Sequence, residues 1–424
     1  MSARHLIGRF LLPHRWPLIV WLGLLGAVLL IRFPIKFLLD PPYLMDFEVF
    51  RTTALRILQG DAHQLFAPVE TEHMFFKYSP WWALLITPLG WMSSHAGAVV
   101  WSGLNVLCLL GTCWVTDRLC RHLDVQPPPF VGILAVLMLV RPITSEFLLG
   151  QTNLLWGLLI AGAVLCDVRH RAWAAAGLLA LAISLKLPAL IFLAYFTLMR
   201  RWRMLGRVAG WLLLLNGVAA AILLPQNPVG LLRTWIQTLL ASGSARAFEI
   251  GNQSLLSLLG RLLRNDGYRL NLFVLPDATI MLIAAGLELV LFLLLFLPSS
   301  RRNPSASQTI CDGALLTTLM VLSSPTCWIA TYNALLMPVM LLLGFVAQRP
   351  RLTWTSPAWT PGLALLFLCS LMMHAKFWRF LGVNFFRGES YVYLVLMVFP
   401  WFGLSLGWCL WKQRRELLEA ASGA

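Results

Sequence analysis

The sequence predicts an all-α polytopic membrane protein, and three observations lead to that fold class. First, 59% of the 424 residues are hydrophobic and only 12% are charged, whereas soluble domains carry about 25% charged residues. Second, several apolar runs reach the roughly 17–25 residues that a helix needs to cross a bilayer. Third, the sequence lacks the short alternating segments of a transmembrane β-barrel. Lipid is therefore the expected solvent for much of the chain.

The basic residues set the expected orientation of the helices. The net charge is +15, and the chain contains 28 Arg and 5 Lys. These residues cluster in short loops between apolar runs, for example at Arg200, Arg201 and Arg203, as in cytoplasmic loops of membrane proteins. Both termini are expected in the cytoplasm. Because topology and anionic headgroups account for the charge, we expect membrane lipids and no nucleic acid as partners.

About 12 transmembrane helices are expected from the apolar runs and the turn signals between them. The expected spans are residues 16–39, 96–116, 130–148, 154–166, 172–185, 187–199, 210–224, 278–297, 310–322, 332–346, 361–374 and 391–411. Residues 81–92 are expected to be interfacial or re-entrant, because a crossing there would place Arg118 and Arg121 outside. No linker interrupts the chain, so we expect one membrane domain, residues 1–424.

Two longer polar regions are expected outside the cytoplasm. Residues 40–80 hold six of the 18 acidic residues. Within them, residues 46–58 show helical spacing of Phe47, Phe50 and Ala54, which predicts an amphipathic juxtamembrane helix lying on the membrane surface. The second region, residues 225–276, is expected to contain helical pieces around 229–240 and 254–263.

In this topology, polar residues from separate loops gather on the outer side. They are Asp46, Tyr78-Ser79-Pro80, Gly150-Gln151-Thr152-Asn153, Lys186, Asn252-Gln253-Ser254, Ser324-Pro325 and Trp328. Several loops converging on one face predict a site beneath the outer headgroups. The cysteines are scattered, without a CxxC motif or Cys/His metal spacing, so neither a metal nor a cofactor is expected.

The same stretches, in the same order, resemble glycosyltransferase family 87 of the GT-C superfamily. The matching pieces are Asp46-Phe-Glu-Val-Phe, Phe76-Lys-Tyr-Ser-Pro80, Gly150-Gln-Thr-Asn153, Lys186-Leu-Pro188, Gly251-Asn-Gln-Ser-Leu255 and Ser324-Pro with Trp328. The resemblance implies a GT-C-type helix bundle. It also implies transfer of a sugar, with mannose expected, from a polyprenyl-phosphate donor to a lipid- or glycan-linked acceptor hydroxyl, with inversion. Family members often carry a His shortly after the Trp, where this chain has Ala330, Thr331 and Tyr332.

Asp46 is the expected catalytic base. An inverting transfer needs a group that takes the proton of the attacking hydroxyl, and a carboxylate suits that role. Asp46 follows the first expected span and stands at the position of the family's Asp. The structural alternative is a helix N-cap, since Asp is favoured before a helical run. Glu48 is expected to be a solvated or supporting neighbour.

The leaving phosphate needs positive charge, and Lys186 is the first candidate because it lies between two apolar half-helices. Lys77 is the second candidate. The alternative for Lys186 is that it snorkels to the headgroups, and the alternative for Lys77 is that it is simply solvated, as loop lysines commonly are. The expected substrate-binding residues are Tyr78, Gln151, Asn153, Asn252, Gln253 and Trp328. The alternative for the amide residues Gln151, Asn153, Asn252 and Gln253 is a turn or cap role. The alternative for Trp328 is a place in the aromatic belt at the membrane interface. Arg141 and Glu146 are expected to pair with each other.

Two other function classes remain open from the residues alone. A secondary transporter or lipid flippase would place functional groups near the midplane, as Glu288 is, and would show an inverted repeat, which we do not find. A glycan polymerase or ligase would share the lipid donor. The glycosyltransferase interpretation places the protein in the cytoplasmic (inner) membrane as a multi-pass enzyme, with its active site facing the periplasm or cell exterior.

Overall fold

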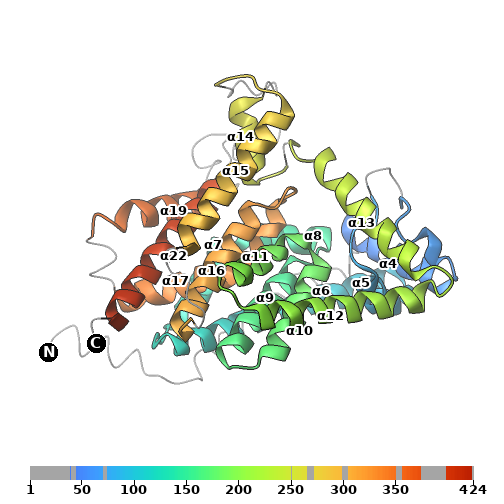
Figure 1. Cartoon of the computed structure of the whole chain (residues 1–424), viewed down its shortest axis with the longest axis horizontal. Coiled ribbons are helices and arrows are strands. Elements are labelled where there is room, and N and C mark those ends of the chain that lie inside the picture. Colours follow the sequence, from blue (N-terminus) through green and yellow to red (C-terminus); the bar gives the residue numbers. More distant parts are fainter. Residues whose placement is uncertain are drawn as a thin grey trace.

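The computed structural model describes residues 39, 44–69, 74–249, 251–264, 272–297, 304–349, 356–373 and 398–422. Within these ranges the chain is helical, and its one β-bridge joins Pro68 to Phe75. Figure 1 shows α4, α5 and α13 at one side of the molecule and α19 and α22 at the opposite side. The expected all-helical fold is confirmed for the described residues. The expected span 16–39 lies outside them except for Leu39.

The helices follow the apolar runs of the sequence closely. Their bounds are α4 Met45–Leu58, α5 Pro80–Ile86, η3 Thr87–Trp91, α6 Ser94–His122, α7 Phe130–Met138, α8 Val140–Leu149, α9 Asn153–Val168, α10 Ala172–Leu185, η4 Leu187–Leu190, α11 Ile191–Leu198, α12 Trp202–Leu223, α13 Pro228–Ala245, α14 Leu255–Leu263, α15 Asp277–Phe296, α16 Ala306–Leu322, η6 Ile329–Leu335, α17 Leu336–Gln348, α19 Thr360–Met372 and α22 Val398–Ser422. A serine hydroxyl accepts a backbone N–H at the start of α5, α6, α14 and α16. Such caps satisfy donors that the first helical turn leaves free.

Four described helices are long and apolar enough to cross a membrane, or five if the bent pair α7 and α8 is one span. The four are α6, α12, α15 and the run Ile329–Gln348. The remaining apolar helices, such as α9, α10 and α16, have 10–17 residues. The structure thus supports a polytopic membrane protein. The helices α5 and η3, with seven and five residues, are too short to cross, as expected for residues 81–92.

The expected single span at residues 130–148 is wrong in one respect, because α7 and α8 meet at an angle of 65°. Pro142 has no N–H to donate to the carbonyl of Met138, so the helix cannot continue regularly. The hydroxyl of Ser370, from α19, donates to that carbonyl at 3.3 Å instead. A backbone carbonyl left unpaired in lipid would cost several kcal/mol, so this contact makes the break tolerable.

The helix α4 also departs from expectation, since its apolar face is covered by protein and not by lipid. Phe47, Phe50 and Ala54 are fully buried, and α4 packs against η3, α5 and α6. Phe50 packs against Trp82 and Trp101, with ring centroids 6.5 and 5.2 Å apart. The helical spacing of apolar residues in α4 therefore reflects packing against other helices. Such spacing indicates that one face is buried, but it does not indicate whether protein or lipid covers that face.

Gly150 allows a close approach to α4. It ends α8 with φ +72°, a left-handed conformation that non-glycine residues rarely adopt. A Cβ at this position would meet Cβ of Phe47 at 2.7 Å and its backbone nitrogen at 3.3 Å. The absence of a side chain thus lets the turn after α8 touch the first turn of α4.

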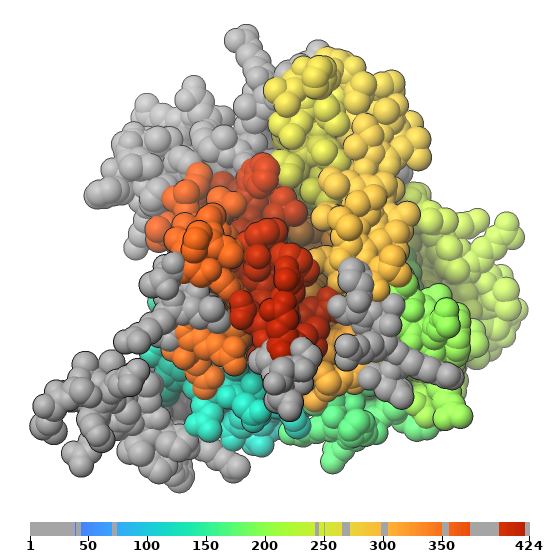
Figure 2. Space-filling model, turned by 60° about the vertical axis from the view of Figure 1, so that its left-hand side comes forward, coloured from blue at the N-terminus to red at the C-terminus, as the bar shows by residue number. Residues whose placement is uncertain are grey.

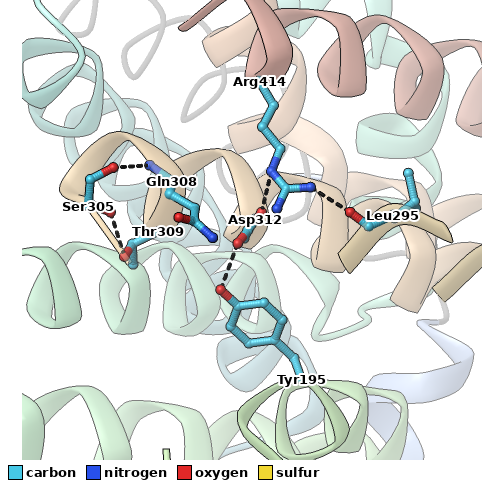
Figure 3. Close-up of polar contacts among 7 residues, drawn as sticks. All are labelled: Tyr195, Leu295, Ser305, Gln308, Thr309, Asp312 and Arg414. Atoms are coloured by element: carbon cyan, nitrogen blue, oxygen red, sulfur yellow. Dashed lines mark hydrogen bonds and ion pairs between the residues drawn. The ribbon is translucent and has the colours of Figure 1, made fainter. Parts of the chain in front are cut away.

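The C-terminal helix α22 closes the other side of the molecule. In Figure 2 it (red) lies between α19 and α17 (orange) and the yellow to light-orange helices α15 and α16. Arg414 of α22 is buried, and its Nε lies 2.8 Å from Oδ1 of the buried Asp312 in α16. Figure 3 shows that Asp312 also accepts from the Tyr195 hydroxyl at 2.7 Å, while Arg414 donates to the Leu295 carbonyl at 2.5 Å. This ionic cluster joins α11, α15, α16 and α22.

Replacing Arg414 with Met should destabilise the protein strongly, because Asp312 would stay buried without its counter-charge. Breaking a buried pair from one side costs about 3–5 kcal/mol, whereas replacing both partners by apolar residues costs much less. We expect Asp312→Leu with Arg414→Met to recover most of the loss, measured by thermal unfolding in detergent. The matched control is Arg415→Met, since Arg415 pairs with Glu419 at an exposed site. Equal losses for Arg414→Met and Arg415→Met would contradict a stabilising cluster.

Gly150→Ala should destabilise by about 2–4 kcal/mol, the sum of left-handed backbone strain and displacement of α4. Gly60→Ala is the control, because Gly60 has φ +84° but a Cβ added there would meet no atom within 4 Å. It should cost only the strain, about 1–2 kcal/mol. Equilibrium unfolding in urea would compare the two variants. If both variants lose the same free energy of unfolding, the contact with Phe47 does not contribute to the destabilisation.

Candidate active site

A cavity of about 280 Å³ lies where α4, the loop before α5, the break between α10 and η4, α13 and residues 324–331 meet. Six of the predicted site residues line it: Asp46, Lys77, Tyr78, Gln151, Lys186 and Trp328. Segments from residue 46 to residue 328 thus converge on one chamber, as the sequence predicted. Among the described residues, its charged lining consists of one carboxylate, that of Asp46, and the cations of Lys77, Lys186 and Arg246.

Asp46 lies in the first turn of α4 but does not cap it. The N-cap position belongs to Leu44, which makes no side-chain cap, so the capping alternative is wrong. Oδ2 of Asp46 instead accepts from Nε2 of Gln151 at 2.9 Å. Burial raises the pKa of Asp46, while the Gln151 hydrogen bond and then the charge of Lys186 oppose the rise. The result is a carboxyl whose proton affinity exceeds that of an exposed aspartate.

Lys186 lies at a helix break that its own sequence causes. Pro188 cannot donate to the Ser184 carbonyl, so α10 ends and Lys186 takes an extended backbone, φ −149° and ψ 123°. The freed carbonyl of Ser184 accepts from the Ser79 N–H at 3.3 Å. This bond ties the loop before α5 to the break. The expected position of Lys186 between two half-helices is confirmed, and its side chain is held inside the protein.

The amides of Gln151 and Asn153 connect Lys186 with Asp46. Nζ of Lys186 donates to Oδ1 of Asn153 at 2.5 Å, and Nδ2 of Asn153 donates to Oε1 of Gln151 at 2.7 Å. Asn153 also donates to Oε2 of Glu146 at 2.8 Å, which Asn333 contacts at 3.1 Å. Glu146 therefore orients amides, and it accepts a third bond from the Leu154 N–H at 3.1 Å.

Lys77 and Tyr78 form the wall beside α4. Burial, with the nearby charge of Arg246, lowers the pKa of Lys77 to about 8. Nζ of Lys77 lies 4.8 Å from the ring centre of Phe75, and its carbonyl accepts from the Trp235 indole at 3.2 Å. Tyr78 packs edge-on against Phe50 with centroids 5.1 Å apart, and burial raises the pKa of its hydroxyl.

Asn153, Asn252 and Gln253 do not line the cavity; they lie behind its wall. Nδ2 of Asn252 donates to the carbonyls of Arg246, Ala247 and Pro325, and its Oδ1 accepts from the N–H groups of Ser254 and Cys327. The side chain is thus occupied in holding two loops together. The main chain of Gln253 bonds to the Cys327 carbonyl and to the Tyr332 hydroxyl.

Arg246 is a cavity residue that sequence reasoning did not single out. It lies just beyond α13, pairs with Glu249 at 3.2 Å and stacks over Trp328 with 5.7 Å to the ring centre. It was one of several arginines in residues 225–276, and only the fold distinguishes it.

The segment after Trp328 also reaches the cavity. Thr331 lines it, whereas Tyr332 turns away to the Gln253 carbonyl. The wall therefore carries a hydroxyl in this stretch, where the resemblance led us to look for a His. Across the described ranges, no group of three or more His, Cys, Asp or Glu side chains is arranged to hold a metal ion.

Comparison with known proteins gives a consistent result. The chain is 25% identical over 419 residues to the polyprenol-phosphate-mannose-dependent alpha-(1-2)-phosphatidylinositol mannoside mannosyltransferase of Mycolicibacterium smegmatis, covering 91% of this chain and 87% of that one. It is 26% identical to the protein of the same description from Mycobacterium tuberculosis, covering 86% of each chain. No solved structure matches the chain.

The family model of glycosyltransferase family 87 matches residues 75–325. That segment is more than half of the chain and contains the predicted motifs from Lys77 to Ser324. The apolar helices agree with a membrane location. The chain therefore belongs to glycosyltransferase family 87 and is a membrane-bound glycosyltransferase.

Proposed function

We propose that this protein transfers mannose, with inversion, from a polyprenyl-phosphate donor to a hydroxyl of a lipid- or glycan-linked acceptor. The observation that carries the proposal is a single chamber in which the carboxylate of Asp46 lies among the cations of Lys77, Lys186 and Arg246. The names of the two mycobacterial relatives support both a polyprenol-phosphate-mannose donor and a glycolipid acceptor.

Asp46 is the base in this proposal. The acceptor oxygen attacks the anomeric carbon, the bond from that carbon to the phosphate oxygen breaks, and the hydroxyl proton passes to the Asp46 carboxylate. The half-buried position of Asp46 supports the role, because a carboxyl with a raised pKa takes a proton more readily. One carboxylate suffices, since a phosphate leaves as an anion and does not need a proton from an acid.

The cations of Lys186, Lys77 and Arg246 hold the donor phosphate. The phosphodiester of the donor carries one negative charge, and the phosphate monoester that leaves carries about −1.5 to −2 at pH 7. Cations fixed in a shielded chamber stabilise such developing charge more strongly than they would in water. Arg246 joins the two lysines in this role, and its place over Trp328 keeps it at the chamber wall.

The sugar and acceptor hydroxyls meet the other residues of the chamber. Tyr78, Gln151 and Trp328 line it and are proposed to contact substrate directly. Asn153, Asn252 and Gln253 are proposed to act from behind, by holding the loops that carry these residues. No metal ion is required in this scheme, because side-chain cations supply the charge that meets the phosphate.

The site is proposed to face the periplasm or cell exterior from the cytoplasmic membrane. The helix α9 runs from Asn153, next to the cavity residue Gln151, to the basic turn at Arg169 and Arg171, and α10 returns from there to Lys186. The site and the basic loops thus lie at opposite helix ends, and basic loops favour the cytoplasmic side. We propose one GT-C-type domain of about 12 spans, counting the shorter apolar helices.

Asp46→Asn should insert and fold normally but lose transfer by about 10²–10⁴-fold, the range for removing a general base. Proteoliposomes with radiolabelled polyprenyl-phosphate mannose and a phosphatidylinositol mannoside acceptor would measure it. Glu48→Gln is the control, because Glu48 accepts from Ser94 and pairs with Arg51 at 3.6 Å outside the cavity. Near-normal turnover of the Asp46→Asn enzyme would refute the assignment of the base.

The pH profile of kcat/KM should be limited by Asp46 and Lys77. Activity falls at low pH as Asp46 takes up a proton, and its raised pKa puts this limb above that of an exposed aspartate. Activity falls again as the pH rises through about 8, where Lys77 loses its charge. Lys77→Arg should therefore move the alkaline limb to higher pH, since Arg stays protonated.

The control for the alkaline limb is Lys412→Arg, because Lys412 stacks on Trp408 and Trp411 in α22, away from the cavity. An alkaline limb that stays in place in Lys77→Arg would show that another group titrates there.

A further inference from the structure

We propose that Gln151 and Asn153 are positioning residues that form an amide relay, a chain of hydrogen bonds from Lys186 to Asp46. The relay keeps the donor phosphate and the carboxylate of the base in a fixed relative position. The inference rests on the proposed function, in which Lys186 meets the phosphate and Asp46 takes the proton. It goes further by assigning to two amides a coupling role between the two ends of the reaction.

The direction of the relay is fixed at both ends. An ammonium can only donate hydrogen bonds and a carboxylate can only accept them. Oδ1 of Asn153 must therefore face Lys186, which turns Nδ2 of Asn153 toward Oε1 of Gln151. Nε2 of Gln151 then has to face Asp46. The observed distances of 2.5, 2.7 and 2.9 Å follow this order without a break.

The middle of the relay is anchored to the helix bundle. Asn153 is fully buried at the start of α9, and its Nδ2 also donates to Glu146. Glu146 is itself held by Asn333 and by the Leu154 N–H. The Trp101 indole binds the Gly150 carbonyl at 2.9 Å, which fixes the turn that carries Gln151. Buried networks whose members are all paired hold one arrangement.

The relay selects which oxygen of Asp46 accepts the proton. Nε2 of Gln151 occupies Oδ2, and an N–H donor favours an unprotonated oxygen. Oδ1 is then the oxygen that receives the acceptor proton, and the bond from Gln151 can persist through the transfer. Loss of this bond would raise the pKa of Asp46, because the bond stabilises the charged carboxylate.

The same chain links donor binding to the base. Lys186 has three N–H donors, of which one binds Asn153. The others can bind phosphate while that bond is kept. A phosphate placed there offsets part of the positive charge that lowers the pKa of Asp46. The bound donor therefore makes Asp46 a stronger base at the moment when the acceptor has a sugar to attack.

The first experiment is the pH profile of kcat/KM for Gln151→Met, which keeps the length of the side chain and removes its donor. We expect kcat to fall with little change in the KM for donor, and the acid limb to move to higher pH. The control is Asn105→Leu, which removes a 3.3 Å bond to the Gln151 carbonyl without touching the relay amides. Its acid limb should not move. A Gln151→Met profile that keeps the wild-type acid limb overturns the proposal.

The second experiment tests whether the coupling passes through Asn153. Lys186→Met and Gln151→Met are made singly and together, once with Asn153 and once with Asn153→Leu, and kcat is measured for each. With Asn153 present, we expect the combined loss to differ from the product of the single losses by at least about threefold, as for coupled residues. With Leu at 153, the losses should multiply. Independent effects in both backgrounds overturn the relay.

Asn153→Ser is made alongside, in case thermal unfolding shows that Asn153→Leu is unstable. Because a hydroxyl can both donate and accept, Asn153→Ser should restore part of the coupling. The Asp46→Asn variant separates the two proposals. If it transfers mannose normally, the proposed function fails. If it is inactive while Gln151→Met keeps the wild-type acid limb, the base assignment stands and only the relay fails.

Discussion

The structure depends on one half-buried carboxylate, Asp46, which shares a chamber with three half-buried cations. A buried carboxylate without partners would be costly, so the chain supplies a hydrogen bond from Gln151 and the charge of Lys186. These partners come from segments more than 100 and 130 residues away in the sequence. Placing them together requires α4 to dock closely on the turn after α8, and Gly150 makes that approach possible.

Two helix breaks are each satisfied by a residue from another segment. Pro142 and Pro188 each leave a carbonyl without its helical partner, and each carbonyl is met by a residue from another segment: Ser370 at Met138, and the Ser79 backbone at Ser184. Within a membrane such carbonyls must be paired by protein. The second break exposes Lys186 to the chamber and draws the loop of Lys77 and Tyr78 to its side. At this second break, irregular backbone lines the cavity.

Sequence reasoning identified Asp46, Lys77, Tyr78, Gln151, Lys186 and Trp328, all of which line the chamber. Their residue types are unusual beside apolar runs, and the resemblance to glycosyltransferase family 87 covers the same stretches. It placed Asn252 among the substrate contacts, but its amide is occupied by backbone groups of two loops. It passed over Arg246, because one arginine in a basic segment carries no local mark. Both differences concern where a side chain points, which depends on tertiary contacts.

The sequence by itself determined the helical membrane fold, the approximate positions of most described helices along the chain, and the family. These follow from apolar run length, proline and serine signals, and ordered motifs, all of which act over short distances along the chain. Only the tertiary structure decided that α4 is covered by protein, that α7 and α8 bend by 65°, and that two amides join Lys186 to Asp46. Those features arise from contacts between distant segments, whose geometry no local pattern records.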